Sequence, residues 1–424
     1  GVNPKNILYA SFDNPIIKLV NADDVIDVYE TLYPVVGERY LFFDEIQHTK
    51  DWELWIKVIY DTRQDVSLTA TGSASPVLEK GASDSGVGRW NVLKVPTMSF
   101  FEYCGLLDIS ERPELPAGIR ITGLSAMGKG ELADLMNRFS PLQRHFNRYL
   151  TIGGFPELAL ADDDTYAQRM LREDVVDKVI KRDVLTLFNV RDPLSMEKLF
   201  LYLCMHSSGI FNKQTAANAL EDIGVSTIED YIRFLEMSNL IYISNPVGVG
   251  SKAALRGKPK IYVADAAIRN AVLMIEDVLS DDAEMGIIAE TVAYKHIVSF
   301  YQNAGASTVG YYRKAKDNQK EVDVVVARPK EKILCEIKYR NDASIPEADA
   351  IVALSREEGT GVSHAFVVTK SLAEYGASKH ETRVPIFRVP LLPFVYILGF
   401  GEANVSNAIS SASEKASVSA GASF

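Results

Sequence analysis

The chain has 424 residues and a formal net charge of −11 at pH 7, with 47% hydrophobic and 24% charged residues. This length exceeds that of one hydrophobic core, so several domains are expected. No stretch supplies the roughly 20 apolar residues that span a bilayer, and the three distant cysteines favour a reducing compartment. We therefore expect a cytoplasmic protein without a membrane partner, whose acidic charge argues against nucleic acid along its whole surface.

Three apolar stretches near the N-terminus, residues 6–13, 39–47 and 65–75, are typical of buried strands with helices between them. Such alternation predicts a parallel sheet that is covered on both faces. The second strand ends in Asp44 and Glu45. Neighbouring side chains point to opposite faces of a strand, so one carboxylate can hold Mg²⁺ while the other orients an attacking water. A solvated acidic turn is the alternative interpretation.

Two further polar residues follow these strands. Ser73 lies near the tip of the third strand, where a hydroxyl can reach a bound water or phosphate, and Arg89 lies on a glycine-flanked loop. A guanidinium there can stabilise phosphate charge. In this order, "FFDEIQ", "TGSAS", "GRW" and "VPTMSFFEY" resemble the AAA+ ATPases of the archaeal type.

The resemblance implies ATP and Mg²⁺ as cofactors and assigns a role to each polar residue. Asp44 would be the metal-binding carboxylate and Glu45 the catalytic one. Ser73 would be the sensor, and Arg89 an arginine finger that acts across a contact between copies in a homo-oligomer. The Walker A loop of this family would precede Gly1, so we expect the parent protein to bind ATP through an upstream segment.

The stretch "GLSAMGKG", residues 123–130, matches the phosphate-loop pattern G-x-x-x-x-G-K-[ST] except at its last position. There Gly130 replaces the Ser or Thr whose hydroxyl binds Mg²⁺. The stretch also follows the strand of Asp44, whereas a phosphate loop would come first in such a sheet. We interpret it as a turn that opens a helix.

Residues 106–190 are predicted to be mainly helical. After them, two short helices broken at Gly224 and a strand are typical of a winged helix. Basic side chains on the wing can contact phosphates and give salt-sensitive binding to nucleic acid, with DNA as the expected partner. A solvated hairpin is the alternative interpretation of the same side chains. The wing residues are Lys252, Arg256, Lys258 and Lys260.

Two strands, "EVDVVVA" and "KILCEIKY", are predicted to form a hairpin whose turn is centred between Pro329 and Lys330. Pairing about this turn sets Asp323 opposite Glu336, and Lys338 falls on the same face as Glu336. Two carboxylates can hold Mg²⁺ or Mn²⁺, and the lysine can orient a metal-bound water.

A helix before this hairpin places Met285, Ile288 and Val292 on one apolar stripe, and Glu290 lies off that stripe, where it can reach toward the hairpin. Together, Glu290, Asp323, Glu336 and Lys338 resemble the site of the PD-(D/E)xK nuclease fold. An exposed ribbon with cross-strand ion pairs is the alternative interpretation.

These patterns predict an α/β multidomain protein. Its expected parts are a partial P-loop AAA+ parallel sheet (1–105), a helical connector (106–190), a winged helix-turn-helix (191–275), a restriction-endonuclease-like domain (280–400) and a disordered Ser/Ala-rich tail (405–424). The hypothesis for function is an ATP-binding protein whose nucleotide state gates a metal-dependent nuclease. The alternative is a non-catalytic, nucleic-acid-binding or regulatory protein whose C-terminal domain is a docking scaffold.

Overall fold

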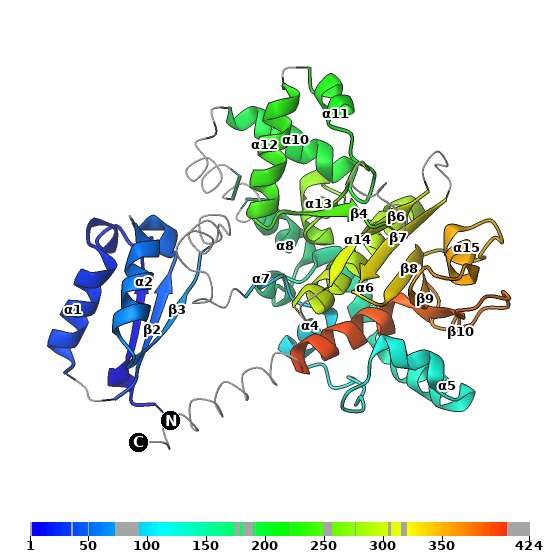
Figure 1. Cartoon of the computed structure of the whole chain (residues 1–424), viewed down its shortest axis with the longest axis horizontal. Helices are drawn as coiled ribbons and strands as arrows, with labels where there is room; N and C mark the ends of the chain where they lie inside the picture. The colour runs from blue at the N-terminus through cyan, green and yellow to red at the C-terminus, as the bar shows by residue number, and fades with distance from the viewer. Residues whose placement is uncertain are drawn as a thin grey trace. The chain divides into compact units, whose positions relative to one another are not determined.

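The computed structural model groups the chain into two compact units, each described here by itself (Figure 1). Unit 1 comprises residues 1–94, 181–191 and 233–239, and unit 2 comprises residues 95–180, 192–232 and 240–424. The structure describes residues 2–34, 37–49, 51–72, 93–173, 179–180, 190, 192–221, 223–248, 257–275, 277–303, 307–314 and 320–404. Predicted features outside these ranges are Ser73, Arg89, Lys252, Arg256 and the tail 405–424.

Unit 1 contains a three-stranded parallel sheet in the order β1–β2–β3, as predicted. Ala10, Leu41 and Phe43 point to one face, where they form a single cluster with Ile26 of α1 and Ile56 of α2. Both helices therefore cover the same face of the sheet. The elements are η1 (Pro4–Asn6), β1 (Ile7–Ser11), η2 (Ile17–Leu19), α1 (Ala22–Leu32), β2 (Arg39–Asp44), η3 (Ile46–His48), α2 (Trp52–Thr62) and β3 (Val66–Ala70).

The other face of this sheet differs from the prediction, because the described helices of unit 1 do not cover it. Ile7, Tyr9 and Phe42 point to this face and are 41%, 65% and 40% exposed. Ser67 and Thr69 of β3 are exposed polar residues on the same face. The alternation along β3 is therefore that of a strand buried on one side only.

Unit 2 is built on an eight-stranded mixed sheet in the order β10–β11–β9–β8–β7–β6–β4–β5. The strands expected in the winged helix, β4 and β5, belong to the same sheet as the predicted hairpin, because β4 pairs in parallel with β6. The strands are β4 (Ile241–Pro246), β5 (Lys260–Val263), β6 (Thr308–Arg313), β7 (Glu321–Ala327), β8 (Lys332–Lys338), β9 (Val362–Thr369), β10 (Gly376–Ala377) and β11 (Ile386–Pro390).

The described helices confirm the helical prediction for much of residues 106–190 and the two helices on either side of Gly224, which are α11 and α12.

The α-helices described from residue 100 onward are α4 (Phe100–Leu106), α5 (Lys129–Arg138), α6 (Gln143–Ile152), α7 (Pro156–Ala159), α8 (Asp164–Met170), α10 (Pro193–Met205), α11 (Lys213–Ala219), α12 (Val225–Met237), α13 (Ala266–Leu273), α14 (Asp282–Asn303), α15 (Ala350–Arg356) and a last helix over 391–404, with the 3-10 helices η4 (Ile121–Ala126) and η5 (Ser140–Leu142).

The GLSAMGKG stretch forms the end of η4 and the start of α5, which begins at Lys129. The stretch begins within a 3-10 helix, and residues 111–120 before that helix form no strand, whereas a phosphate loop follows a strand. The prediction that this stretch is a turn opening a helix is confirmed.

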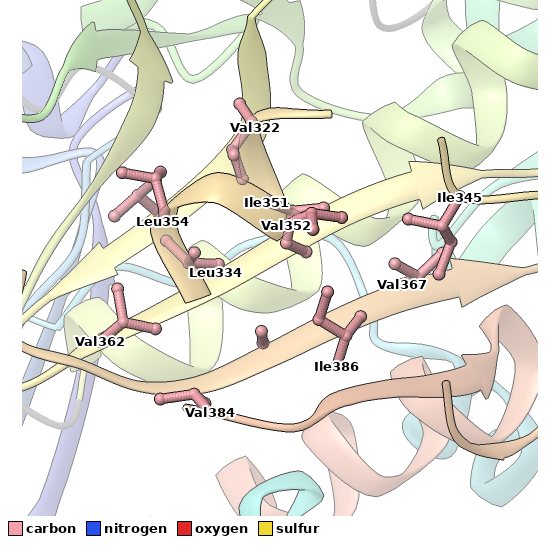
Figure 2. Close-up of a cluster of buried hydrophobic side chains, with 13 residues drawn as sticks. Val322, Leu334, Ile345, Ile351, Val352, Leu354, Val362, Val367, Val384 and Ile386 are labelled. Carbon is pink, nitrogen blue, oxygen red and sulfur yellow. The ribbon is translucent and has the colours of Figure 1, made fainter. Parts of the chain in front are cut away.

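A hydrophobic cluster fixes α15 against the sheet of unit 2 (Figure 2). Ile351 and Val352 of α15 meet Leu334 of β8, Val367 of β9 and Ile386 of β11, and each is at most 1% exposed. Burying a side chain of this size contributes roughly 1.5–3 kcal/mol. The cluster therefore holds the N-terminus of α15 in place beside β8.

Candidate functional site

The tip of β2 carries Asp44, whose carboxylate accepts three hydrogen bonds from hydroxyl groups. Tyr9 Oη and Ser11 Oγ of β1 donate to Oδ2 at 2.8 and 3.2 Å, and Thr71 Oγ1 donates to Oδ1 at 2.5 Å. The bond from Thr71 is the largest cause that holds the pKa of Asp44 below its ordinary value, against the opposing effect of burial. Asp44 is therefore ionised at neutral pH, as a Mg²⁺ ligand must be.

Glu45 follows Asp44 in the left-handed region, with φ 51° and ψ 42°. This conformation is uncommon for a residue with a side chain, and such backbone strain is often found at functional sites. The Glu45 carboxylate accepts a hydrogen bond from Gln47 Nε2. The two adjacent carboxylates therefore have different hydrogen-bond partners. This difference is consistent with two different roles, one in binding a metal and one in orienting water.

Sequence analysis did not single out Tyr9 and Ser11 as neighbours of Asp44. The signal was present, because residues two apart in a strand share a face and Ser11 pairs with Asp44 in the parallel register. The sequence alone did not give the register in which β1 pairs with β2.

The predicted hairpin is formed by β7 and β8. Its register runs from Val324 opposite Cys335 to Ala327 opposite Lys332, which confirms the predicted turn centre. This register ends one pair before the predicted pair of Asp323 and Glu336. Instead, the Asp323 side chain accepts a hydrogen bond from the backbone N–H of Ile337 through Oδ2 at 2.9 Å.

Lys260 lies among the carboxylates of this region. Its Nζ is 3.1 Å from Glu290 Oε1, 2.6 Å from Glu321 Oε1 and 3.2 Å from Asp323 Oδ1. Burial alone would lower the pKa of Lys260, but these acids outweigh it and raise the pKa well above its ordinary value. Its side chain is 3% exposed, whereas sequence analysis placed Lys260 on an exposed wing. Lys258, two residues earlier, is exposed.

Two glutamates of this cluster titrate abnormally. Burial, and then the neighbouring Asp323, raise the pKa of Glu290 to about 7, although Lys260 and Tyr262 oppose the shift. The same two causes raise the pKa of Glu336 well above its ordinary value. Glu336 Oε2 is buried without a hydrogen-bond partner. A proton on either glutamate would reduce the excess negative charge of the cluster.

Lys338 lies on the same face of β8 as Glu336, as predicted, with Nζ 3.8 Å from Glu336 Oε1. Its shorter contact is with Asp349 Oδ2 at 2.9 Å. Asp349 precedes α15, so the hydrophobic cluster of Figure 2 also positions this acid. The structure thus joins Glu290 to Asp323 through Lys260, and Glu336 to Asp349 through Lys338.

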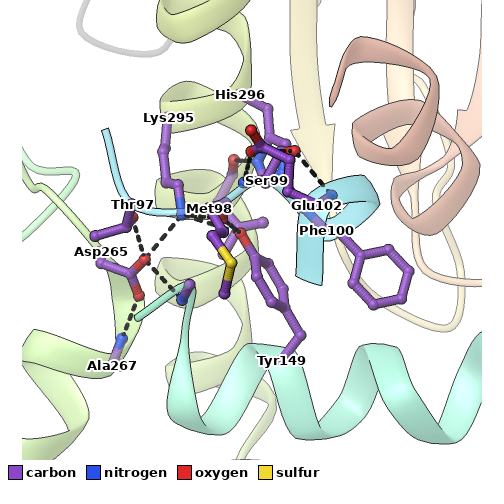
Figure 3. Close-up of polar contacts among 12 residues, drawn as sticks. Thr97, Met98, Ser99, Phe100, Glu102, Tyr149, Asp265, Ala267, Lys295 and His296 are labelled. Carbon is purple, nitrogen blue, oxygen red and sulfur yellow. Dashed lines mark hydrogen bonds and ion pairs between the residues drawn. The ribbon is translucent and has the colours of Figure 1, made fainter. Parts of the chain in front are cut away.

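A second buried network of unit 2 joins the segment before α4 to α14 (Figure 3). Lys295 Nζ donates to Asp265 Oδ2 at 2.8 Å, to Met98 O at 2.9 Å and to Tyr149 Oη at 3.0 Å. Asp265 Oδ2 also accepts from Thr97 Oγ1 at 2.6 Å. Burial raises the pKa of Asp265, but Lys295 and these hydrogen bonds outweigh it and leave the pKa below its ordinary value.

Gly153 and Gly154, which begin the stretch "GGFPE" (residues 153–157), pack against this network. A Cβ added at Gly153 would lie 2.0 Å from Asp265 Oδ1, and one added at Gly154 would lie 2.2 Å from Met98 O. Gly154 also exchanges hydrogen bonds with the network, through its N–H to Asp265 Oδ2 and its carbonyl oxygen to the N–H of Met98. The pair allows close approach of the backbone and has a structural role.

Comparison with protein families divides the chain into three parts. Residues 2–104 match a family model described as an AAA domain. The chain thus carries an AAA domain at its N-terminus. Residues 143–279 and 285–389 match two models that are each described as a domain of unknown function, DUF8612 and DUF4143. An AAA domain implies the use of a nucleotide and Mg²⁺, and the ionised Asp44 is a suitable ligand for this metal.

Two proteins of the archaeon Methanocaldococcus jannaschii are similar to the chain. Uncharacterized protein MJ1544 is 22% identical over 264 residues, which are 61% of this chain and 54% of that protein. Uncharacterized protein MJ1637 is 25% identical over 344 residues, which are 79% of this chain and 69% of that protein. The chain therefore spans about half of the first relative and about two thirds of the second.

Two features are absent from the described residues. No three His, Cys, Asp or Glu side chains within those ranges are arranged to hold a metal ion. No helix in the same part of the chain is long and apolar enough to cross a membrane.

Proposed function

We propose that the AAA domain binds ATP with Mg²⁺ at the tip of β2 and that nucleotide binding regulates the C-terminal half. The observation that carries this proposal is the ionised Asp44, held by three hydroxyl groups in the domain that matches the AAA model. Asp44 would hold the metal and Glu45 would orient water. The roles proposed for Ser73 and for Arg89, the latter across a homo-oligomer contact, rest on the sequence resemblance.

The C-terminal half fits a docking scaffold better than a metal-dependent nuclease. Its proposed winged helix is supported by α11, α12 and β4, and its proposed PD-(D/E)xK-like fold by the β7–β8 hairpin. The carboxylates that a nuclease would use are paired with Lys260 and Lys338. We therefore propose that nucleic acid, with DNA as the form expected from the sequence, is a binding partner and not a substrate.

A nuclease is the second candidate function. It is favoured by Glu336 and Lys338 on one face of β8, with Asp323 at the adjoining end of β7. Cleavage of DNA or RNA by the chain with Mg²⁺ or Mn²⁺, abolished by Glu336→Gln, would establish this candidate. The scaffold proposal expects no such cleavage.

The test of nucleotide binding is an equilibrium titration with a fluorescent ATP analogue at fixed Mg²⁺. The variant is Asp44→Asn, and the matched control is Asp27→Asn, whose carboxylate is exposed on α1. We expect Asp44→Asn to weaken Mg²⁺-dependent binding about tenfold or more, since a metal ligand is lost, and the control to bind like the parent. Equal binding by Asp44→Asn and the parent would contradict the proposal.

A further inference from the structure

The ammonium group of Lys260 has the surroundings that proteins usually give to a bound cation. Three carboxylates, from Glu290, Glu321 and Asp323, lie within 3.2 Å of its Nζ. The ring of Tyr311 adds a cation–π contact, with its centroid 5.7 Å from Nζ. The lysine is therefore enclosed by negative charge on several sides.

The backbone holds Lys260 in this position from both edges of β5. Lys260 pairs with Ser244 of β4 on one edge and forms a bridge with Ile210 on the other. The adjoining Pro259 carbonyl oxygen accepts a hydrogen bond from the N–H of Phe211 at 2.7 Å. All four residues of β5 are buried. Withdrawal of the amino group would thus require a rearrangement of the strand or of a fully buried side chain.

The carboxylates around Lys260 are already committed to hydrogen bonds. Glu290 Oε1 accepts from Lys260 and, at 2.7 Å, from Tyr262 Oη. Asp323 accepts from Lys260 with one oxygen and from the N–H of Ile337 with the other. A divalent ion needs these same lone pairs at about 2.0–2.6 Å, and its charge would repel the ammonium group beside it.

We propose that Lys260 is a built-in substitute for a divalent cation at this carboxylate cluster, and that removal of its charge converts the cluster into a divalent-metal site. The carboxylates that surround its Nζ, those of Glu290, Glu321 and Asp323, would then supply the oxygen ligands. Lys260 belongs to the part of the chain that matches DUF8612, and the three acids belong to the part that matches DUF4143. The lysine of one domain thus keeps metal out of the other. The proposal concerns unit 2 alone, so it stands or falls separately from nucleotide binding at Asp44.

The test is a titration of the full chain with Mn²⁺, followed by the electron paramagnetic resonance signal of free Mn²⁺ and without nucleotide. All chains carry Asp44→Asn, so that the proposed nucleotide site does not contribute. The variant is Lys260→Met, and the matched control is Lys258→Met, which removes an exposed lysine two residues away. Circular dichroism establishes that each variant is folded.

We expect the background chain and the Lys258→Met control to show no Mn²⁺ binding that depends on Asp323. Lys260→Met should gain one Mn²⁺ per chain, and a further Asp323→Asn substitution should weaken that binding about tenfold or more, because a ligand is lost. If Lys260→Met does not fold, Lys260→Met with Glu321→Gln relieves part of the excess charge and keeps the carboxylates of Glu290 and Asp323 as ligands.

Two results would overturn the proposal. The first is Mn²⁺ binding by the background chain that Asp323→Asn abolishes, because Lys260 would then not exclude metal. The second is a folded Lys260 variant that gains no Mn²⁺ binding.

Discussion

Two buried groups of charged side chains in unit 2 differ in their balance of acid and base. Around Lys295, one ammonium group faces one carboxylate, that of Asp265, and it donates its other hydrogen bonds to two neutral groups, the Met98 carbonyl and the Tyr149 hydroxyl (Figure 3). Around Lys260, one ammonium group faces three carboxylates, with Glu336 nearby. The first group is a balanced ion pair that joins segments of the fold. The second group contains more carboxylates than its lysine can neutralise.

The pKa shifts follow this difference. The pKa of Asp265 is below its ordinary value although its side chain is 2% exposed, because Lys295 and several hydrogen bonds outweigh burial. The pKa of Glu290 is raised, because burial and Asp323 outweigh the single Lys260. Burial by itself therefore does not mark a functional site. An excess of buried carboxylates is more informative, since the excess charge must be met by a proton, a lysine or a metal.

The largest expected effect comes from breaking the balanced pair. Lys295→Met leaves the Asp265 carboxylate buried and without its counter-ion, which destabilises a protein by about 3–5 kcal/mol. Chemical unfolding followed by circular dichroism measures this change, whereas tryptophan fluorescence does not report on unit 2, because all three tryptophans precede residue 95.

The matched double variant sharpens this prediction. Adding Asp265→Asn to Lys295→Met removes the unpaired charge, so the double variant should lose less stability than the sum of the single losses. Additive losses would mean that the pair does not act as a unit.

An intermediate effect is expected at the glycine pair. Gly154→Ala forces Met98 and Lys295 away from the added Cβ, so it should destabilise unit 2 by roughly 1–3 kcal/mol through overpacking. Gly123→Ala, in the GLSAMGKG stretch, is the control because nothing lies within 4 Å of a Cβ there. Equal melting temperatures of the two variants would contradict the close approach at Gly154.

The smallest expected effect is a change of pH dependence in the acidic group. Glu290 has a folded-state pKa of about 7, above its unfolded value, so the stability that it contributes is present at low pH and is lost as pH rises through about 7. Glu290→Gln cannot ionise, and it should reduce the fall in unfolding free energy between pH 4.5 and 7.5 by roughly 1–2 kcal/mol. Parallel stability curves for Glu290→Gln, the exposed control Glu358→Gln and the parent would contradict the shift.

Local patterns were sufficient to predict the hairpin and the parallel strands. The β7–β8 turn follows from Pro329 and Lys330, and the turn fixes the register from the pair Val324–Cys335 to the pair Ala327–Lys332. The carboxylates at the tip of β2 follow from the apolar run that ends at Asp44. These features depend on residues close together in the chain, where alternation and turn chemistry act directly.

The partners of the buried lysines could not be predicted in this way. Lys260 follows a basic segment that suggested exposure, and its acids lie 30 to 63 residues further on. Lys295 meets Met98 across 197 residues. Whether such a lysine is buried depends on which strands and helices, distant in sequence, pack beside it. The periodicity of apolar residues does not indicate these neighbours.

The most direct test of the account is an anomalous difference map from a crystal of the parent chain soaked in MnCl₂. We predict no Mn²⁺ peak within coordination distance, about 2.2 Å, of Glu290 or Asp323, with Lys260 Nζ among the carboxylates. The same soak of Lys260→Met should show such a peak. A peak at these carboxylates in the parent, with Lys260 displaced, would contradict the claim that this lysine holds the place of the metal.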